Sequence, residues 1–346
     1  MEGAGFGCML WGMNLKLSTV AARRGGWFDR ADVLAAGYSD DDIHLRIKDG
    51  SWVRLFRGVY AEVGVDYDLL ASWDQRIWRH VRTAKAAYHQ AGGGAVLSHQ
   101  SALLLHGVQI GDLDLSRVHL TNLARLGRST RWMCQHAPRP PVLDPVEVEG
   151  VCLTPAPRSV VEAIRGTSYP VAVSVVDEAL RRELATIAQL SEALGLFGGR
   201  TGIGTATRAV QFGDGRSESA GESRLRVLMA DLGLPKPRLQ AEIRDLSGRL
   251  VGRVDFLFEE WGVIVEFDGA LKYAGKGSAP LVLEKAREDA LRDLGYEVVR
   301  ATWPDLSAPA AFTVRVAQAR DRSRRRSNAV LSAAGNLQGV SRRTSR

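Results

Sequence analysis

The segment that most constrains the fold is a pair of apolar runs at residues 249–269, RLVGRVDFLFEEWGVIVEFDG, which also carries regularly placed carboxylates. Val, Ile and Phe dominate both runs, and EEWG interrupts them, a pattern that predicts an antiparallel hairpin. With the turn centred in the middle of EEWG, Asp255 lies directly opposite Glu266, and their Cβ atoms are about 5 Å apart.

Side-chain alternation sorts this hairpin into two faces. Asp268 shares the face of Glu266, because residues two apart along a strand point the same way. The opposite face is apolar and should join the core; it consists of Val254, Phe256, Phe258, Val263, Val265 and Phe267. Like charges this close repel one another, so the carboxylates either splay into water or share a cation. A hard divalent metal ion would relieve the repulsion, and the pattern therefore suggests a metal site.

Composition limits the class of protein. The chain has 346 residues, 45% hydrophobic and 25% charged, which is ordinary for a soluble protein of two or three domains. The chain has three cysteines, Cys8, Cys134 and Cys152. They are widely spaced and form no CxxC pair, which argues against a disulfide framework or a zinc finger. No apolar run reaches the roughly 20 residues of a membrane span, and the start lacks the basic residues of a signal peptide. We therefore expect a cytoplasmic protein that is neither exported nor bound to membranes.

Positive charge is concentrated at the C-terminal end. Residues 313–346 contain nine arginines and one aspartate, whereas the whole chain has a net charge of +7. The tail alone therefore makes the protein basic. Its composition predicts a largely disordered tail after a final helix. Such a tail either adds sequence-independent affinity for phosphates or only keeps the protein soluble.

Residues 13–62 indicate three short helices followed by a hairpin, the order of a winged helix-turn-helix. Asp29 and Ser39 are suited to cap the second and third helices. The third helix would enter the major groove and the hairpin would form the wing, so the candidate DNA contacts are His44, Arg46, Lys48, Arg54 and Arg57. Three aspartates at residues 40–42 suit the helix dipole better than they suit phosphates. A protein-docking or purely structural role is therefore the alternative.

Residues 63–196 mix helical stretches with short strands and predict a middle α/β domain. Within it, LSHQSALLLHG places His99 and His106 on one helical face. No acidic or cysteine partner lies nearby in the sequence, so capping or core packing is the expected role. The glycine-rich residues 197–216 lack the pattern of a phosphate loop and are expected to form a linker.

A third domain is expected over residues 217–312. Its predicted order is αβββαβ: helix 217–232, strands 239–244, 249–258 and 262–268, helix 281–294 and strand 296–302. With the preceding regions this predicts a multidomain α/β (α+β) protein: an N-terminal winged helix, a mixed α/β middle region and a C-terminal αβββαβ domain.

The acidic residues match the needs of metal-dependent phosphodiester cleavage, in which carboxylates hold Mg²⁺ and a cation stabilises developing negative charge. Asp255 and Glu266 would hold the ion. Glu222 lies on the helix before the hairpin, beside its apolar stripe, and could complete the metal shell through water. Alternatively, Glu222 forms an S-x-x-E capping box with Ser219, a role that needs no metal.

Four ordered motifs carry a resemblance to a known group: GESRLR at 221–226, RVDF at 253–256, VEFDG at 265–269 and LEKAREDALRDLGYEVVRATWPDL at 283–306. Together they resemble the PD-(D/E)XK nuclease superfamily, and more closely the DUF559 group, which is similar to very-short-patch-repair endonucleases. The resemblance implies a restriction-endonuclease-like domain, with Asp255 and Glu266 as ligands of Mg²⁺ or Mn²⁺ and Glu222 as the helix acid.

The chain departs from the superfamily pattern at the catalytic lysine. The E-x-K motif would place lysine where this chain has Asp268, so the remaining catalytic candidates are Asp268 itself, Lys272 and Lys285, either lysine being able to reach a phosphate. No histidine follows His136, which excludes a histidine-based mechanism in this domain. The candidate phosphate contacts are Arg253, Arg287 and Arg292. Alternatively, these arginines are solvated charges that pair with neighbouring acids.

A second resemblance involves the N-terminal segment GGWFDRADVLAAGYSDDDIHLRIKDGSWVRLFRGVYA, which is similar to the winged-helix region of AbiEi-type antitoxins; LSHQSALLLHG and VHLT extend it to residue 121. These features predict a DNA-binding protein with a Mg²⁺-dependent endonuclease domain. One alternative is an antitoxin-like transcriptional regulator whose nuclease-like domain only binds, and another is an interaction scaffold. DNA is the expected partner, and a homodimer or a cognate toxin are further candidates.

Overall fold

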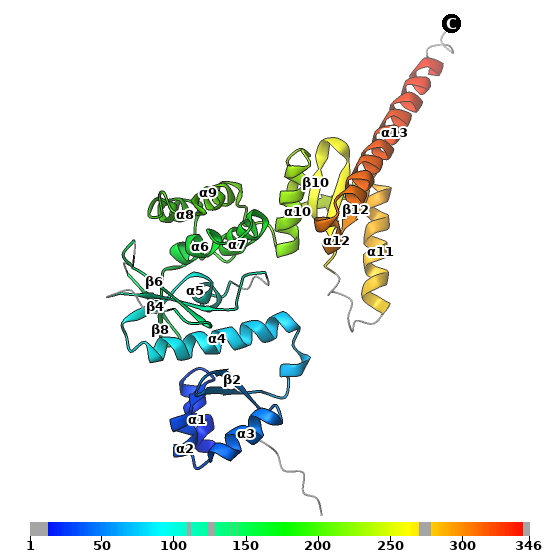
Figure 1. The fold of residues 1–346 in the computed structure, drawn as a ribbon. Helices are drawn as coiled ribbons and strands as arrows, with labels where there is room; N and C mark the ends of the chain where they lie inside the picture. Colours follow the sequence, from blue (N-terminus) through cyan, green and yellow to red (C-terminus); the bar gives the residue numbers. More distant parts are fainter. Residues whose placement is uncertain are drawn as a thin grey trace, which may run out of the picture. The chain divides into compact units, whose positions relative to one another are not determined.

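The computed structural model describes residues 13–108, 112–123, 129–138, 140–142, 144–269 and 278–341. Helices and strands alternate along them in a mixed α/β architecture (Figure 1). The chain forms two compact units: the first runs to Thr167 and includes Leu184–Arg208, and the second consists of Ser168–Glu183 and the chain from Ala209 onward. Over the described ranges, no helix is long and apolar enough to cross a membrane.

The first unit begins with a winged-helix-like arrangement. Its elements are α1 (Leu15–Arg23), β1 (Phe28–Asp29), α2 (Arg30–Ala35), α3 (Asp40–Lys48), β2 (Trp52–Phe56) and β3 (Val59–Glu62), with the strands in the order β1-β3-β2. Capping boxes begin two of the helices, with Asp29 at α2 and Ser39 at α3. Both predicted caps are therefore confirmed.

The β2–β3 hairpin contributes to two hydrophobic clusters. Trp52 packs with residues of α1, α2 and α3. Phe56 belongs to the second cluster, where its ring stacks on Trp132 with 4.0 Å between the centroids. The hairpin expected to act as a wing is thus packed against the middle region, while Arg54 and Arg57 stay exposed.

A five-stranded sheet organises the middle region, in the order β6-β5-β4-β8-β7. Its strands are β4 (Ala95–Leu97), β5 (Val118–Asn122), β6 (Met133–His136), β7 (Val146–Val148) and β8 (Val151–Leu153), and the helices of this part are α4 (Ser72–Gln90), α5 (His99–Leu105), α6 (Ala156–Ile164) and α8 (Ile187–Gly195). Strands β5 and β6 are parallel, with His119 opposite Cys134 and Thr121 opposite His136. His136 lies two residues after Cys134, so His119 and His136 share one face of the sheet.

Residues 197–216, expected to form a linker, contain the helix α9 (Ile203–Phe212). Ala206, Ala209 and Val210 are buried. Their spacing of three and four residues places them on one helical face, which explains why the segment is helical despite its glycines.

The second unit has the αβββαβ order expected from the sequence. Its elements are α10 (Ala220–Asp231), β9 (Arg238–Arg244), β10 (Leu250–Phe258), β11 (Val263–Phe267), α11 (Ser278–Asp293) and β12 (Glu297–Ala301), and the strand order is β12-β11-β10-β9. The hairpin register is also as predicted, because Phe256 pairs with Val265. One residue further along each strand, Asp255 lies opposite Glu266.

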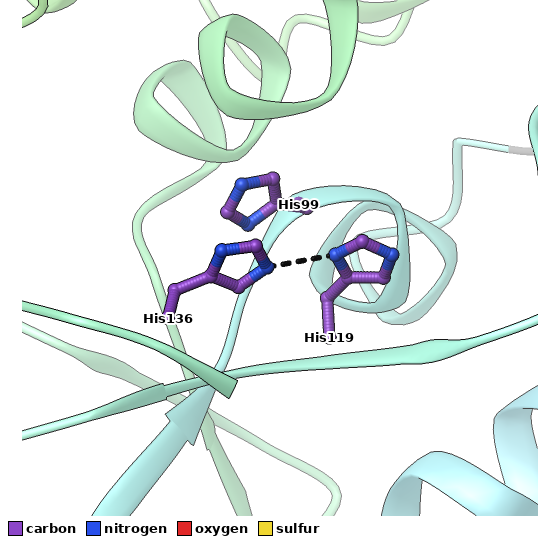
Figure 2. Close-up of side chains that lie close together, drawn as sticks. All are labelled: His99, His119 and His136. Carbon is purple, nitrogen blue, oxygen red and sulfur yellow. Dashed lines mark hydrogen bonds between the residues drawn. The ribbon is translucent and has the colours of Figure 1, made fainter. Parts of the chain in front are cut away.

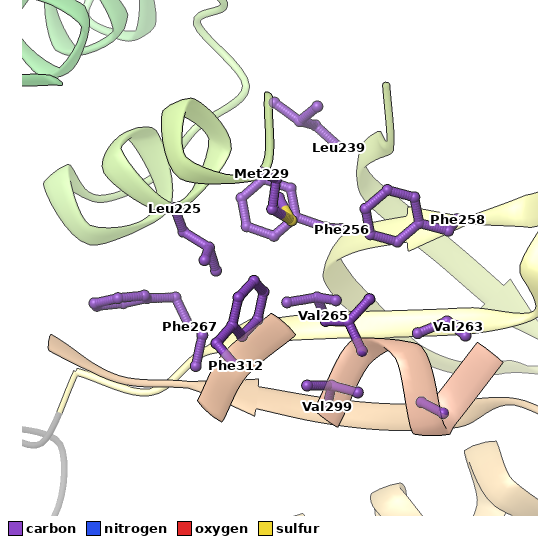
Figure 3. Packing of buried hydrophobic residues seen from close by; sticks show 13 residues of the cluster. Leu225, Met229, Leu239, Phe256, Phe258, Val263, Val265, Phe267, Val299 and Phe312 are labelled. Atoms are coloured by element: carbon purple, nitrogen blue, oxygen red, sulfur yellow. The ribbon is translucent and has the colours of Figure 1, made fainter. Parts of the chain in front are cut away.

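Hydrophobic residues cover both faces of this sheet. One cluster joins Leu225 of α10 to Phe256 and Val265 of the hairpin and to Phe312 of α13 (Ala310–Ser341) (Figure 3). These contacts account for most of the apolar face predicted from alternation along the strands.

The face that carries the acids also contributes to the core, which the sequence did not predict. Leu257 and Ile264 are buried there in a second cluster with Leu291 of α11, and this cluster also contains Val254, which had been expected on the first face. Helix α11 covers this face, a fact that the hairpin sequence alone does not reveal. The carboxylates are therefore confined to the end of the sheet where Asp255 and Glu266 lie.

Helix α13 replaces the largely disordered tail predicted for residues 313–346, as far as Ser341. Phe312, Val316 and Ala319 are buried in the first cluster of the sheet. Their spacing of four and three residues forms one helical face. The expected domain boundary at residue 312 therefore falls inside a helix that contributes to the core.

Helix α7 (Tyr169–Arg181) belongs to the second unit. Its Asp177 accepts two hydrogen bonds from Arg226 of α10, at 2.8 and 2.7 Å. The two side chains are only 1% and 6% exposed, so this is a buried ion pair. Because Arg226 follows Glu222 by one helical turn, the pair also fixes the helix that carries the predicted helix acid.

Candidate functional site

Three of the predicted acidic residues, Asp255, Glu266 and Asp268, line a cavity of about 370 Å³ in the second unit. The end of the β10–β11 hairpin forms one side of it, and α11 and β12 contribute arginines. The charged residues that line it include Asp255, Glu266, Asp268, Arg253, Arg287 and Arg300. Acidic and basic side chains therefore alternate around one opening.

Asp255 is held by the neighbouring strand. Its Oδ2 accepts a hydrogen bond from the backbone N–H of Phe267 at 2.8 Å. This bond lies next to the paired positions of the hairpin, so the register that sets Asp255 opposite Glu266 also orients its carboxylate. A carboxylate that the backbone already fixes loses little rotamer freedom when it binds a ligand.

Glu222 takes the capping role that the sequence offered, and it is also hydrogen-bonded to a residue of the cavity. Its backbone N–H donates to Ser219 Oγ at 3.2 Å, and Ser219 Oγ–H donates to Glu222 Oε1 at 2.8 Å, as in a cap. The other oxygen accepts from Gln240 Nε2 at 3.0 Å, and Gln240 lines the cavity. Burial raises the pKa of Glu222, and the nearby charge of Asp255 raises it further.

Gly221 allows α10 to lie this close to the hairpin. A Cβ atom on Gly221 would come within 2.0 Å of the ring of Phe267. No side chain fits at that distance, so any substitution must displace the ring of Phe267 or push α10 away from β11. The glycine next to Glu222 therefore sets the distance between the helix acid and the hairpin acids.

Glu266 is paired with an arginine from α11. Arg287 donates to Glu266 Oε1 at 2.9 Å and to the backbone oxygen of Arg253 at 3.2 Å. Burial raises the pKa of Glu266, Arg287 opposes the rise, and Asp255 adds to it. The two facing carboxylates thus influence each other electrostatically, as the predicted register requires.

Position 268 has no lysine, but the adjacent strand supplies a positive charge. Arg300 of β12 pairs with Glu266 in the parallel register, and its guanidinium lies 3.8 Å from Asp268. Arg300 also contacts Glu284 and Glu288 of α11 at 2.8 and 2.9 Å. Arg287 and Arg300 therefore place positive charge at this cavity; the sequence named Arg287 as a candidate phosphate contact and missed Arg300.

The other predicted catalytic and phosphate-binding residues are divided between the cavity and other places. Lys285 is exposed on α11 and is not among the cavity-lining residues, and Lys272 lies outside the described residues. Arg292 pairs with Glu288 at 2.7 Å in the solvated helix arrangement considered as its alternative. Arg253 lines the cavity and pairs with Glu218 at 2.7 Å.

Among the described residues, the acids of this cavity do not form a cluster of three ligand atoms within 4.8 Å of one another. They are therefore not arranged as a closed three-carboxylate cage. Mg²⁺ does not need one, because it usually binds through one or two carboxylates and keeps several waters.

The predicted DNA contacts in the first unit divide into two groups. Arg46 is a packing residue, since its guanidinium lies 5.2 Å from the ring centroids of both Tyr38 and Trp52. His44 bonds the backbone oxygen of Asp40 at 2.7 Å but its side chain is exposed. The other exposed candidates are Lys48, Arg54 and Arg57.

A group of three histidines in the middle region was missed from the sequence. His99, His119 and His136 each offer a ligand atom, and these atoms lie within 4.8 Å of one another. His106, which the sequence paired with His99, instead contacts the backbone oxygen of Thr154 at 2.9 Å. The sequence did place His119 and His136 in two short segments that could be strands. That the two histidines share one face becomes clear only when the pairing of these strands is known.

Fold and comparisons together define the class: a multidomain α/β protein with an N-terminal antitoxin-type regulator domain. Residues 16–63 match the family described as a transcriptional regulator, AbiEi antitoxin. This range covers α1 to β3, the winged-helix-like part of the first unit.

Two Mycobacterium tuberculosis proteins, described as the uncharacterized proteins MT2308 and Rv2248, are each 30% identical to this chain over 288 residues. The match covers 82% of this chain and 97% of each relative, so the chain belongs to the same family. The crystal structure of the RV2827C protein from Mycobacterium tuberculosis aligns with a TM-score of 0.32 at 15% identity, over 66% of this chain and 87% of that chain. A likeness at this TM-score supports no argument about fold.

Proposed function

We propose that the protein binds DNA through its AbiEi-type N-terminal domain and cleaves phosphodiester bonds in its C-terminal unit with the help of Mg²⁺ or Mn²⁺. The observation that carries the proposal is that Asp255 and Glu266 line one cavity together with arginines, while Glu222 is linked to the cavity through its hydrogen bond from Gln240. The order αβββαβ supports it, because this is the order expected for a PD-(D/E)XK or DUF559-type nuclease domain.

The donor set fits a hard divalent ion. Asp255 and Glu266 supply carboxylate oxygens from facing strands, and Glu222 can contact a bound water from the helix side. A bound ion would lower the pKa of a coordinated water and stabilise charge at phosphorus. Asp255 keeps its orientation through the Phe267 N–H, so it holds its oxygen in place for the ion.

The arginines take the part that lysine plays in the superfamily. Arg287 and Arg300 line the same cavity as the carboxylates. A guanidinium is always charged and donates several hydrogen bonds in a plane, which suits phosphate oxygens. When phosphate displaces the Arg287 contact to Glu266, the carboxylate becomes available to the ion and the guanidinium to the developing negative charge.

Plasmid cleavage tests this proposal. Purified full-length protein is incubated with supercoiled plasmid and Mg²⁺ or Mn²⁺, beside the double variant Asp255→Asn/Glu266→Gln. The exposed turn residue Glu260→Gln is the matched control in the same domain. We expect the double variant to lose nicking by at least about 100-fold, as for loss of major electrostatic groups, and the control to retain it. If the double variant still nicks the plasmid, this site does not carry out the reaction.

A non-enzymatic regulator is the second candidate function. Asp268 in place of lysine favours it, as do the protein partners that already satisfy Glu222 and Glu266. In this case the chain shifts DNA from its own promoter region but cuts nothing with any divalent metal ion. Loss of the shift in Lys48→Ala/Arg57→Ala, with Lys16→Ala as a control, would assign the contact to the N-terminal domain.

A further inference from the structure

Three histidines from separate segments meet in the middle region (Figure 2). His99 begins α5, His119 lies in β5 and His136 ends β6. His119 Nδ1 and His136 Nε2 are 2.9 Å apart. The ring of His99 stacks on that of His136 with 3.9 Å between centroids and lies 5.1 Å from that of His119.

The three imidazole rings are neutral, so each can offer a nitrogen lone pair to a metal ion. Burial lowers the pKa of His119 to about 3 and that of His136 to about 4. Burial also lowers the pKa of His99, and the charges of Arg165 and Arg158 act in the same direction. Each ring therefore carries one proton and one lone pair at neutral pH, which is the form of histidine that binds metal ions.

Hydrogen bonds indicate which nitrogen of each ring is available. Gln100 Nε2 donates to Asp114 O at 2.8 Å and lies 2.9 Å from His119 Nε2, so that nitrogen accepts and Nδ1–H donates to His136. His99 Nδ1 faces Ser98 Oγ at 3.0 Å, which leaves Nε2 of His99 for another partner. The hydrogen between His119 and His136 is the one that a metal ion would replace.

The buried carboxylate of Glu162 contacts His99 and helps to orient it. Glu162 is 3% exposed, and its Oε2 lies 3.6 Å from His99 Nδ1 and accepts from the backbone N–H of His99 at 3.3 Å. Arg158 holds the other oxygen at 2.7 Å. Ligating histidines commonly direct their second nitrogen to a carboxylate in this way.

The backbone of His99 is strained. Its φ is +54°, in the left-handed region that non-glycine residues adopt rarely. Such strain persists only where the surroundings fix the residue, and it concentrates at functional sites.

We propose that His99 Nε2, His119 Nδ1 and His136 Nε2 bind one Zn²⁺ ion. Bonds of about 2.0–2.1 Å in tetrahedral geometry place ligand nitrogens about 3.3 Å apart. The His119–His136 contact therefore widens by about 0.4 Å when the ion replaces the proton, and His99 turns out of its stack. The proton that leaves Nδ1 of His119 moves to Nε2 of the same ring, so the side-chain amide of Gln100 must move away from that nitrogen.

The fourth position of the ion faces a cavity of about 310 Å³. His99 and His136 line it together with Thr121, Arg158, Arg165 and Arg200. Three nitrogen ligands and one open position are typical of reactive zinc sites, whereas structural sites are closed by four protein ligands. The cationic lining favours water, hydroxide or an anion as the fourth ligand.

Metal titration of untagged, full-length protein tests the proposal. After removal of metal with EDTA, Zn²⁺ is titrated calorimetrically, and Co²⁺ is followed by its visible absorption. We expect about one ion per chain and a four-coordinate Co²⁺ spectrum. His119→Gln and His136→Asn should weaken Zn²⁺ binding by at least about 100-fold, and Glu162→Gln by about 10–100-fold. His44→Asn, an exposed histidine of the same unit, should leave binding unchanged.

Melting curves in EDTA separate loss of the site from loss of the fold. A variant that melts like the wild type without metal but no longer gains stability from Zn²⁺ supports the assignment. Where a histidine variant does not fold, Glu162→Gln decides, since it leaves all three rings in place. Failure of the wild type to bind a stoichiometric ion, or unchanged affinity in folded His119→Gln, His136→Asn or Glu162→Gln, would overturn the proposal.

Discussion

Acid should destabilise the first unit through His80, a buried histidine of α4. Its Nε2 lies 2.8 Å from Ser101 Oγ and its Nδ1 lies 3.0 Å from the backbone oxygen of Leu115. The backbone oxygen of Leu115 can only accept, so in the neutral ring Nδ1 carries the proton and Nε2 accepts the hydrogen of Ser101 Oγ. Burial lowers the pKa of His80 to about 4, although the Leu115 contact and the charge of Asp114 oppose the shift.

The size of the effect follows from the difference between folded and unfolded pKa values. Above about pH 6.5, His80 is neutral in both states and contributes nothing to the pH dependence. As the pH falls from about 6.5 to about 4, the unfolded chain takes up a proton that the folded chain refuses, so stability is lost over this window. At pH 5 the loss relative to pH 7 is about 2 kcal/mol.

Urea unfolding of the full chain, followed by tryptophan fluorescence in EDTA, measures this loss at both pH values. His80→Gln should lower stability at pH 7 because it disturbs a packed site. It should also remove about 2 kcal/mol of the difference between pH 7 and pH 5. The exposed His44→Gln should change neither quantity. An unaltered pH difference in His80→Gln would refute the assignment of acid sensitivity to this residue.

Three further outcomes are expected. Asp177→Asn leaves Arg226 buried without its partner and should cost about 3–5 kcal/mol in the unfolding free energy of the second unit, measured in urea. Phe312→Ala should cost about 3–5 kcal/mol in the same assay because it opens the core, whereas Val314→Ala on the exposed side of α13 should stay within about 0.5 kcal/mol. Arg287→Gln should reduce plasmid nicking by about 100-fold while DNA binding in a gel shift is retained.

Local patterns in the sequence predicted the C-terminal hairpin well. The alternation of Val and Phe and the break at EEWG fix the turn, and the turn fixes the register that sets Asp255 opposite Glu266. The caps at Asp29 and Ser39 were predictable for the same reason, since a cap depends on residues within one helical turn. Features decided by neighbours in sequence are therefore the ones that could be predicted.

Features that depend on packing between distant segments could not be predicted from the sequence. The placement of Arg287 and Arg300 at the acidic cavity depends on how α11 and β12 meet the hairpin, and the histidine group needs three separate segments. The helix beginning at Ala310 is a different case, because Phe312, Val316 and Ala319 form a readable apolar stripe. The prediction of a disordered tail relied on the arginine-rich composition instead of on this stripe. The same composition is also found on the exposed face of a helix.

The two proposed metal sites differ in donor chemistry, and this makes their tests independent. The C-terminal cavity offers carboxylate oxygens, which suit Mg²⁺ or Mn²⁺, whereas the middle region offers three neutral imidazoles, which suit Zn²⁺. Protein stripped with EDTA and given only Mg²⁺ should therefore nick DNA with the histidine site empty, if the two sites act separately. Nicking that requires Zn²⁺ and is lost in His136→Asn but not in Asp255→Asn/Glu266→Gln would instead place the reaction at the histidines, whose open fourth position faces the arginine-lined cavity.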